Sequence, residues 1–435
     1  MHTQARTPRS QALGLMGWLV VCFAALHPLT AYADPVTPPG SEVDGDAGQD
    51  SDAEPTSDAE VTGEPDLDAD KPEAEDDRFF IIRYLDALLG MPDDPTKPRF
   101  IAYPVAGYAP ETSWEFGLSA LYVYYAEDNP SNRLSEIKTF GFYTLKNQFG
   151  LYLRHANYTH EDTWFFLGEG RFQSFPLQYY GVGADTLAEP LARVDQVTLM
   201  FDERILRNVA PSLYVGPGVG FERLSDVSFN FGEGVVPELP NGAAGSFNLG
   251  LGLSVVYDTR RNVLNVRDGF FSDLSAFHSN EVWGSDFSFW SVESDTRAYF
   301  PINERDTLAL QLYGRATLGD VPYNALSTLG GESLMRGYYR GRYRDKNYVG
   351  TQLEYRFLPL PFFDGPITRR FGASLFGGAG TVFPGPELPD AEDVVFAGGG
   401  GLRFLIFPDK DIYTRADLAF TSEGQSFYIF IGEAF

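Results

Sequence analysis

Residues 247–258 have the sequence FNLGLGLSVVYD. Large apolar side chains occupy every second position from Phe247 to Tyr257, and Asn, Gly, Ser, Val and Asp fill the alternate positions. Successive side chains of a β-strand point to opposite faces, so this segment is predicted to be a strand with one apolar face. A strand that has lipid on one side and a polar lumen on the other shows this pattern.

The same alternation recurs along most of the chain, in residues 114–124, 308–318 and 348–357. In the last segment, the apolar Val349, Leu353, Tyr355 and Phe357 oppose the polar Gln352, Glu354 and Arg356. A soluble β-sandwich can alternate too, but many long strands, aromatic strand ends and an N-terminal secretory signal favour a membrane. With strands of about 10 residues, residues 99–435 accommodate roughly sixteen. The predicted fold is therefore all-β, a transmembrane antiparallel β-barrel.

An even number of strands determines which connections share a side of the membrane. If Phe435 lies on the periplasmic side, residues 258–269, 301–306 and 407–412 are short periplasmic turns, and residues 224–246, 329–347 and 384–394 are outer loops. The long connections then lie outside, as is usual for outer-membrane barrels.

Negative charge is concentrated near the N-terminus. The 435-residue chain has a formal charge of -27, and residues 34–77 hold 17 Asp or Glu against one basic residue, Lys71. A chain this acidic is a poor ligand for nucleic-acid phosphates, so nucleic-acid binding is not expected. Residues 34–77 also have almost nothing to bury and are predicted to be a disordered acidic tail. A solvated spacer is the simpler interpretation; binding of a basic chaperone or client is the alternative.

The first 33 residues have the features of a cleaved secretory signal. Arg6 and Arg9 precede an apolar stretch at 12–26, and Ala-Tyr-Ala at 31–33 precedes the acidic tail. The only cysteine, Cys22, lies in the apolar stretch, and the residues before it do not suit lipidation. The mature chain is expected to have no thiol and no disulfide.

A short amphipathic segment is predicted at residues 78–98. Its apolar part lies between Asp77 and Gly90, which are helix start and stop signals. We expect it to dock at the membrane interface or in the barrel mouth. No long apolar run follows, which argues against transmembrane helices.

The most distinctive passage is LGGESLMRGYYRGRYRDKN at residues 329–347. Its Arg336-Gly337-Tyr338 resembles the Arg-Gly-Phe/Tyr tripeptide in the sixth outer loop of the superfamily typified by BamA and TamA, the bacterial surface antigen domain. The resemblance implies that the loop folds back into the lumen and that its arginine meets acidic residues on the wall. Glu354 matches the wall glutamate of the family, and a guanidinium can pair with it through parallel hydrogen bonds.

The next predicted strand departs from the family pattern. Phe376, Gly378 and Gly380 resemble the Phe-x-Asp-x-Gly motif, but Gly378 replaces the aspartate. The resemblance therefore implies only one expected partner for Arg336, namely Glu354. Either the loop is held less firmly or another acid substitutes.

Further motifs support the resemblance. Residues 257–270 are similar to the Asp-Thr-Arg turn of the family, and residues 108–112 to a motif near its first hairpin. The chain ends with Phe430, Gly432 and Phe435, similar to the C-terminal signal by which such barrels are recognised for insertion. The resemblance also implies a weak seam between the first strand, near residues 99–108, and the last, near 426–435.

Residues for catalysis or metal binding are scarce. His155 and His160 are five positions apart and fall on opposite faces of a strand, so they form no local metal pair. A Gly-x-Ser-x-Gly nucleophile elbow and a phosphate loop are both lacking. We expect no enzymatic activity, no metal and no cofactor. The glycines at 216–220 and 398–401 are interpreted as sites where the barrel bends.

The resemblance implies a factor for membrane-protein insertion or protein translocation in the outer membrane of a Gram-negative bacterium, with the acidic tail in the periplasm. Outer-membrane lipids, lipopolysaccharide, unfolded outer-membrane proteins and a separate periplasmic protein are the expected partners. Residues 34–90 are too short and polar for the family's periplasmic POTRA domains, so a short form without them is expected. The alternative is a pore or a surface- or lipid-binding barrel, whose basic residues at 336–346 would bind lipopolysaccharide phosphates if the loop points outward.

Overall fold

The computed structural model describes residues 94, 96–109, 113–232, 238–360, 368–387 and 389–435. The predicted signal peptide (1–33) and acidic tail (34–77) lie outside the described residues, as does most of the predicted segment at 78–98. No helix in the described part has the length and apolarity needed to cross a membrane.

Nineteen β-strands make up most of the described chain. They are β1 (Arg99–Ala109), β2 (Ser113–Tyr125), β3 (Leu134–Thr144), β4 (Phe149–Tyr158), β5 (Trp164–Ser174), β6 (Leu177–Tyr179), β7 (Ala192–Ala210), β8 (Leu213–Phe231), β9 (Ser246–Asp258), β10 (Gly269–Ser279), β11 (Phe289–Pro301), β12 (Asp306–Gly319), β13 (Ser327–Leu329), β14 (Tyr343–Asp345), β15 (Asn347–Phe357), β16 (Phe371–Phe383), β17 (Val395–Phe407), β18 (Ile412–Thr421) and β19 (Gly424–Ile431).

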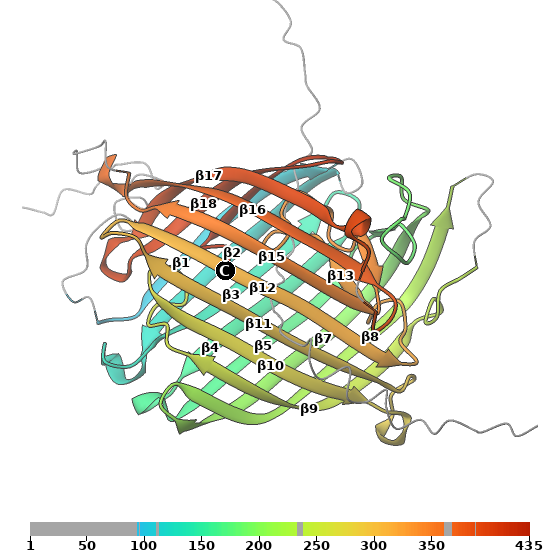
Figure 1. Cartoon of the computed structure of the whole chain (residues 1–435), viewed down its shortest axis with the longest axis horizontal. Coiled ribbons are helices and arrows are strands. Elements are labelled where there is room, and N and C mark those ends of the chain that lie inside the picture. Colours follow the sequence, from blue (N-terminus) through green and yellow to red (C-terminus); the bar gives the residue numbers. More distant parts are fainter. Residues whose placement is uncertain (1–93, 95, 110–112, 233–237, 361–367, 388) are drawn as a thin grey trace, which may run out of the picture. The chain divides into compact units, whose positions relative to one another are not determined.

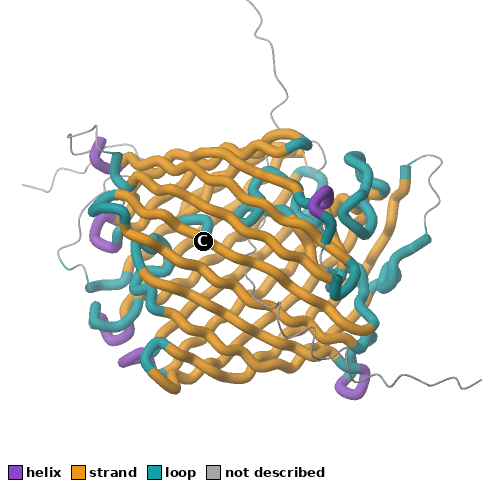
Figure 2. The backbone as a smooth tube through the Cα atoms, in the orientation of Figure 1, coloured by secondary structure: helices purple, strands orange, loops and turns teal. Residues whose placement is uncertain are grey.

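Seventeen of these strands form one antiparallel sheet, and β13 pairs with β14 in a separate small hairpin. Each strand of the large sheet pairs with its neighbours along the chain, from β1–β2 to β18–β19. Strands β5 and β6 lie end to end beside β7, so the sheet has sixteen strand positions. Figures 1 and 2 show the sheet wrapped into a barrel, with front strands crossing those of the back wall. The predicted antiparallel barrel of roughly sixteen strands is confirmed.

The connections divide between two ends of the barrel. Of the described residues, the turn end holds 126–133, 159–163, 211–212, 259–268, 302–305, 358–360, 368–370 and 408–411, and the loop end holds 145–148, 180–191, 232, 238–245, 280–288, 320–346, 384–387, 389–394 and 422–423. The described residues of the three predicted turns share one end, and those of the three predicted loops share the other. The predicted loop at 224–246 begins too early, because β8 continues to Phe231 through its pairing with β7.

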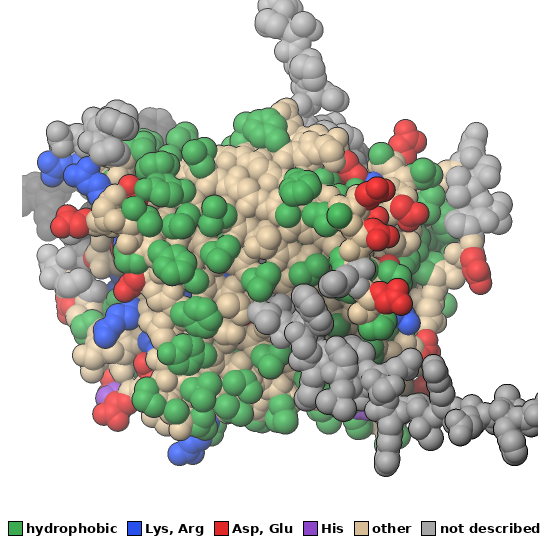
Figure 3. All heavy atoms as spheres, viewed as in Figure 1, with side chains coloured by type: hydrophobic (Ala, Val, Ile, Leu, Met, Phe, Trp, Pro, Cys, Tyr) green, Lys and Arg blue, Asp and Glu red, His purple; other side chains and the backbone are tan. Residues whose placement is uncertain are grey.

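The outer wall is apolar between two charged ends. Along β9, Leu253 is 67% exposed, whereas its neighbour Ser254 is fully buried towards the lumen. This alternation confirms the apolar face predicted for residues 247–258. Figure 3 shows apolar side chains over the middle of the wall and most charged side chains near its ends. An exposed apolar band of this extent is suited to lipid, and the ladders satisfy the backbone within it.

Candidate functional site

The long connection between β12 and β15 is packed inside the barrel. Leu329, Met335 and Tyr338 belong to one buried apolar cluster. The backbone N–H of Gly183, from the connection between β6 and β7, donates a 2.9 Å hydrogen bond to the carbonyl of Arg344. The loop is thus inserted in the lumen, as the resemblance implies.

Three arginines that the outward-facing alternative would assign to lipopolysaccharide are buried in this loop. Arg336, Arg342 and Arg344 are all less than one-tenth exposed. Arg342 donates hydrogen bonds to both carboxylate oxygens of Glu423, each at 2.7 Å. These side chains face protein rather than the surroundings of the barrel.

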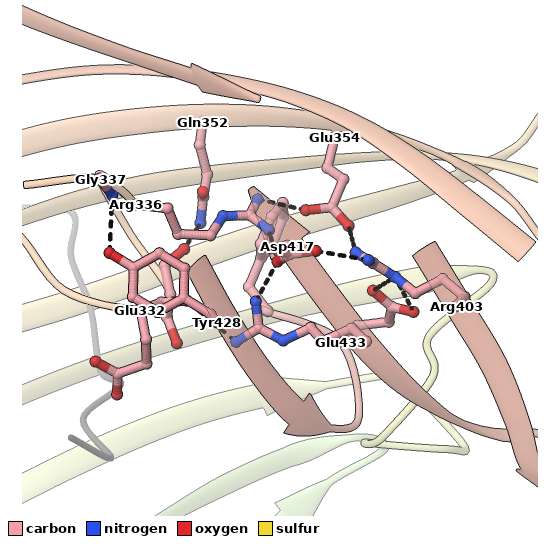
Figure 4. A network of polar contacts seen from close by, with 12 residues as sticks. Glu332, Arg336, Gly337, Gln352, Glu354, Arg403, Asp417, Tyr428 and Glu433 are labelled. Atoms are coloured by element: carbon pink, nitrogen blue, oxygen red, sulfur yellow. Dashed lines mark hydrogen bonds and ion pairs between the residues drawn. The ribbon is translucent and has the colours of Figure 1, made fainter. Parts of the chain in front are cut away.

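Arg336 is held by two carboxylates from different strands. Its Nη1 donates to Asp417 Oδ2 of β18 at 2.7 Å, and its Nη2 donates to Glu354 of β15. All three side chains are fully buried, and the guanidinium lies 3.5 Å from the ring centre of Phe376 in β16. Figure 4 shows Arg336 pointing between the two acids. The planar guanidinium suits such a two-sided contact, which fixes the loop to strands β15 and β18.

Asp417 supplies the second acid that Gly378 lacks. A Cβ atom added to Gly378 would lie 3.5 Å from Met335 Sδ, so the loop packs closely over this glycine. The interpretation that Arg336 keeps a single partner is wrong, and the alternative of a substituting acid holds. Arg415 and Asp417 are two positions apart in β18, so both side chains point to the lumen. The alternating pattern of this strand could therefore have identified Asp417 as an acid on the lumen face.

Asp417 and Glu354 are part of a larger group that we call the arginine–carboxylate cluster. Its members are Arg336, Arg356, Arg403, Arg415, Glu354, Asp417 and Glu433.

 Arg403 connects three of the acids: Nη2 donates to Glu354 Oε1 at 3.0 Å, Nη1 to Asp417 Oδ1 at 2.6 Å, and Nε to Glu433 Oε2 at 2.9 Å. Four guanidinium groups and three carboxylates therefore share one buried space.

A glycine makes room for this group. Gly401 of β17 lies beneath the pair of Asp417 and Arg403, and a Cβ atom there would collide with both side chains. The glycines at 398–401 were interpreted from the sequence as bending sites, and for Gly401 the structure gives a more specific reason. A larger residue at this position would displace the cluster.

The C-terminal residues leave the wall and enter the lumen. β19 ends at Ile431, and Gly432 turns the chain with a φ of +85°. Phe435 is buried, and its carbonyl accepts a 2.9 Å hydrogen bond from Arg356 Nη2. The prediction that the last strand extends to Phe435 is wrong, because the turn at Gly432 ends the pairing with β18. Phe430 still lies on the lumen face, beneath the Arg415 guanidinium at 5.0 Å.

The first and last strands meet at a seam, which we define as the boundary between β1 and β19. Among the described residues, β1 forms a ladder with β2 alone and β19 with β18 alone. Side chains do connect the two sides, since Ile431 packs against the apolar cluster that contains Ile101. In Figure 1 the first strands (blue) and the last (dark red) come together at the upper edge of the barrel.

The inserted loop also contacts the seam strand β19. The N–H of Gly337 donates to Tyr428 Oη at 2.9 Å, and Ser426 Oγ donates to the carbonyl of Gly337 at 3.2 Å. Gly337 has a φ of +110°, which favours glycine. Tyr428 and Ser426 were not predicted as site residues, because nothing in their own segment indicates a contact with residue 337.

The Asp-Thr-Arg turn crosses the turn end of the barrel. Asn262 Nδ2 donates to the carbonyl of Lys410 at 2.7 Å, and Arg267 Nη2 donates to Asp411 Oδ1 at 2.8 Å. These bonds join the β9–β10 turn to the β17–β18 turn, which are far apart in the wall. Burial lowers the pKa of Lys410 below its ordinary value. The turn covers part of the lumen mouth.

The Omp85 superfamily domain matches residues 206–404. This range contains Arg336, Glu354 and Phe376, whereas Asp417 and Glu433 follow it. No curated protein matches the sequence.

Several solved structures are similar in fold. BamA from Haemophilus ducreyi lacking POTRA domains 1-3 aligns with 15% identity and a TM-score of 0.49, covering 77% of this chain and 70% of that chain. CdiB from Acinetobacter baumannii aligns with 10% identity and a TM-score of 0.49, covering 77% and 59%. CdiB from Escherichia coli aligns with 9% identity and a TM-score of 0.47, covering 77% and 61%. The chain thus spans about three-fifths of each CdiB structure.

Proposed function

We propose that this chain, a transmembrane barrel whose residues 206–404 match the Omp85 superfamily domain, inserts other β-barrel proteins into the outer membrane through the seam between β1 and β19. The observation that carries this proposal is that β19 forms a ladder with β18 alone among the strands that the structure describes. The proposed role is not enzymatic.

The physical basis is the demand of backbone groups for partners. The free edge of a strand offers a row of N–H and C=O groups that an incoming extended segment can pair with. In lipid an unpaired group is costly, so a client strand that covers the edge gains stability. The outer edge of β19 would act as the template for the first strand of a client.

The anchored loop has a supporting role in this proposal. Gly337 is bonded to Tyr428 of β19, and Arg336 is bonded to Asp417 of the adjacent strand β18. These contacts hold the last hairpin from inside, while its outer edge forms no ladder with any other described strand. The loop would keep the template strand in place during client pairing.

We further propose that the loop end faces the cell exterior and that the turn end, with the N-terminal tail, faces the periplasm. Lipids would cover the apolar wall, and lipopolysaccharide would surround it in the outer leaflet. Clients would be unfolded outer-membrane proteins, delivered directly or by a separate periplasmic protein.

A pore is the second candidate function. Two lumen cavities, of about 280 and 180 Å³, both border Glu332 and Ser333 of the inserted loop. Charged side chains, including Glu169 and Asp202, line both cavities, which favours passage of small polar solutes. The Asp-Thr-Arg turn across the turn end disfavours it, because this turn covers part of the lumen mouth.

The test is a client-folding assay in liposomes that contain the full chain. An unfolded outer-membrane barrel is added, and its folding rate is compared with and without a thiol cross-link between cysteines at positions 101 and 431, which lie in one apolar cluster. We expect acceleration that is lost when this cross-link seals the seam. A control cross-link between positions 418 and 427, which already pair within β18–β19, should leave the acceleration intact. Absence of acceleration in the unmodified chain would overturn the proposal and favour the pore.

A further inference from the structure

The last residues of the chain contribute to the environment of the loop anchor. Glu433 receives Arg403 Nε on both carboxylate oxygens, at 3.0 and 2.9 Å. The same Arg403 donates to Glu354 and Asp417, the two acids that hold Arg336. Figure 4 shows the Glu433 carboxylate bonded to the Arg403 guanidinium, which also reaches Glu354 and Asp417. One guanidinium therefore links the C-terminal residues to both partners of the loop arginine.

Glu433 affects the charge balance of the arginine–carboxylate cluster. With Glu433 in place, the cluster holds four arginines and three carboxylates, all buried. Without it, four arginines would compete for Glu354 and Asp417 alone. Like charges in a buried site repel strongly, and unpaired buried charges are costly. Withdrawal of Glu433 would therefore weaken the hold on Arg336.

The same C-terminal residues follow one strand of the seam and are linked to the other through Leu264. They follow β19 directly, and the Gly432 N–H donates to the carbonyl of Tyr413 at 2.8 Å. The Glu433 N–H donates to the carbonyl of Leu264 at 2.9 Å, and Leu264 belongs to the apolar cluster that contains Ile101 of β1. A displacement of β19 would pull on contacts that reach β1, the β9–β10 turn and the cluster together.

We propose that residues 432–435 form a latch that couples the loop anchor to the seam: when the latch leaves the lumen, Arg336 is held less firmly, and when Arg336 is released, the latch loosens. The proposal rests on the proposed function in its use of the seam as the moving part. Glu433 is then a positioning residue, which acts on Arg336 through Arg403. Coupling of this kind is reciprocal by thermodynamic necessity, so it can be tested from both ends.

The test measures thiol labelling in the full chain. A Cys22→Ser background removes the only native cysteine, and single reporters are introduced as Ser333→Cys in the loop or Ala434→Cys in the latch. We expect Glu433→Gln to raise the labelling rate at position 333 several-fold, and Arg336→Ala to raise the rate at position 434 several-fold. Glu433→Asp keeps the charge and should preserve slow labelling at position 333.

Glu392→Gln is the matched control, because it makes the same chemical change on an exposed connection between β16 and β17. Folding of every variant is checked by its heat-sensitive migration in gels. If Glu433→Gln leaves position 333 unchanged, or if Arg336→Ala exposes only the loop, the latch is refuted. Labelling requires no client, so this outcome is independent of whether the barrel accelerates client folding.

Discussion

The N–H of Gly337 donates a 2.9 Å hydrogen bond to the hydroxyl of Tyr428, so the residue after the loop arginine is attached to the seam strand. Tyr428 is almost fully buried, and no water can easily replace its hydroxyl. The loop therefore carries a direct backbone connection to β19 in addition to the ion pairs of Arg336.

Tyr428→Phe should destabilise the barrel by about 1–3 kcal/mol, because the Gly337 N–H loses its partner in a buried place. The ring remains, so packing against Phe376 and Ala419 is unchanged. Urea unfolding in detergent, followed by tryptophan fluorescence, measures the difference. Tyr257→Phe, on the exposed outer face of β9, is the control and should change little. Equal effects of the two substitutions would contradict the role of this hydrogen bond.

Gly401→Ala should disrupt the arginine–carboxylate cluster, because the added methyl group would collide with Asp417 and Arg403. Overpacking of this kind costs roughly 1–3 kcal/mol. The free energy of unfolding and the protease sensitivity of the loop would both report the change.

Gly398→Ala is the matched control on the same strand. Its added methyl group would meet only the carbonyl of Phe376, at an ordinary 3.5 Å. We expect a native-like barrel, or a slightly more stable one. If the two alanine variants behave alike, Gly401 has no special steric role.

The barrel could be predicted because the alternation of apolar and polar residues is visible within each strand's own sequence. A strand between lipid and lumen needs apolar residues at alternate positions, and Phe247 to Tyr257 carry that requirement in their own sequence. The end of β8 was missed because Asp226, Ser228 and Asn230 gave residues 225–231 the polarity of a loop. Pairing with β7 keeps this stretch extended, and that pairing depends on a distant segment.

The site was predictable only where a motif marked it. The resemblance identified Arg336 and Glu354, and the structure brings them together. Asp417 reaches Arg336, and Arg403 and Glu433 join the same cluster, because the barrel closes on itself and the chain turns inward at Gly432. Neither the register of distant strands nor the inward turn of the C-terminal residues can be derived from local alternation.

Arg336→Lys should loosen the loop almost as much as Arg336→Ala. The planar guanidinium of Arg336 donates to two carboxylates at once, and a lysine ammonium cannot reproduce this geometry. Removing one partner from a buried ion pair costs roughly 3–5 kcal/mol. Urea unfolding gives the energy, and limited proteolysis at residues 329–347 gives the state of the loop. Arg193→Ala, at an exposed ion pair with Asp195, is the control and should cost little. A lysine variant as stable as the native chain would indicate that charge alone holds the loop.

Asp417→Asn tests whether Asp417 serves as the second acidic partner of Arg336, in place of the aspartate that is missing at Gly378. The substitution keeps the shape but removes the charge that faces Arg336, Arg403 and Arg415, so we expect a loss of about 3 kcal/mol. Because Arg336 contacts Asp417 directly, the double variant with Arg336→Ala should lose less stability than the sum of the two single losses. Urea unfolding of all four proteins measures this coupling. Strict additivity would mean that the two residues stabilise the barrel independently and that Glu354 alone anchors the loop.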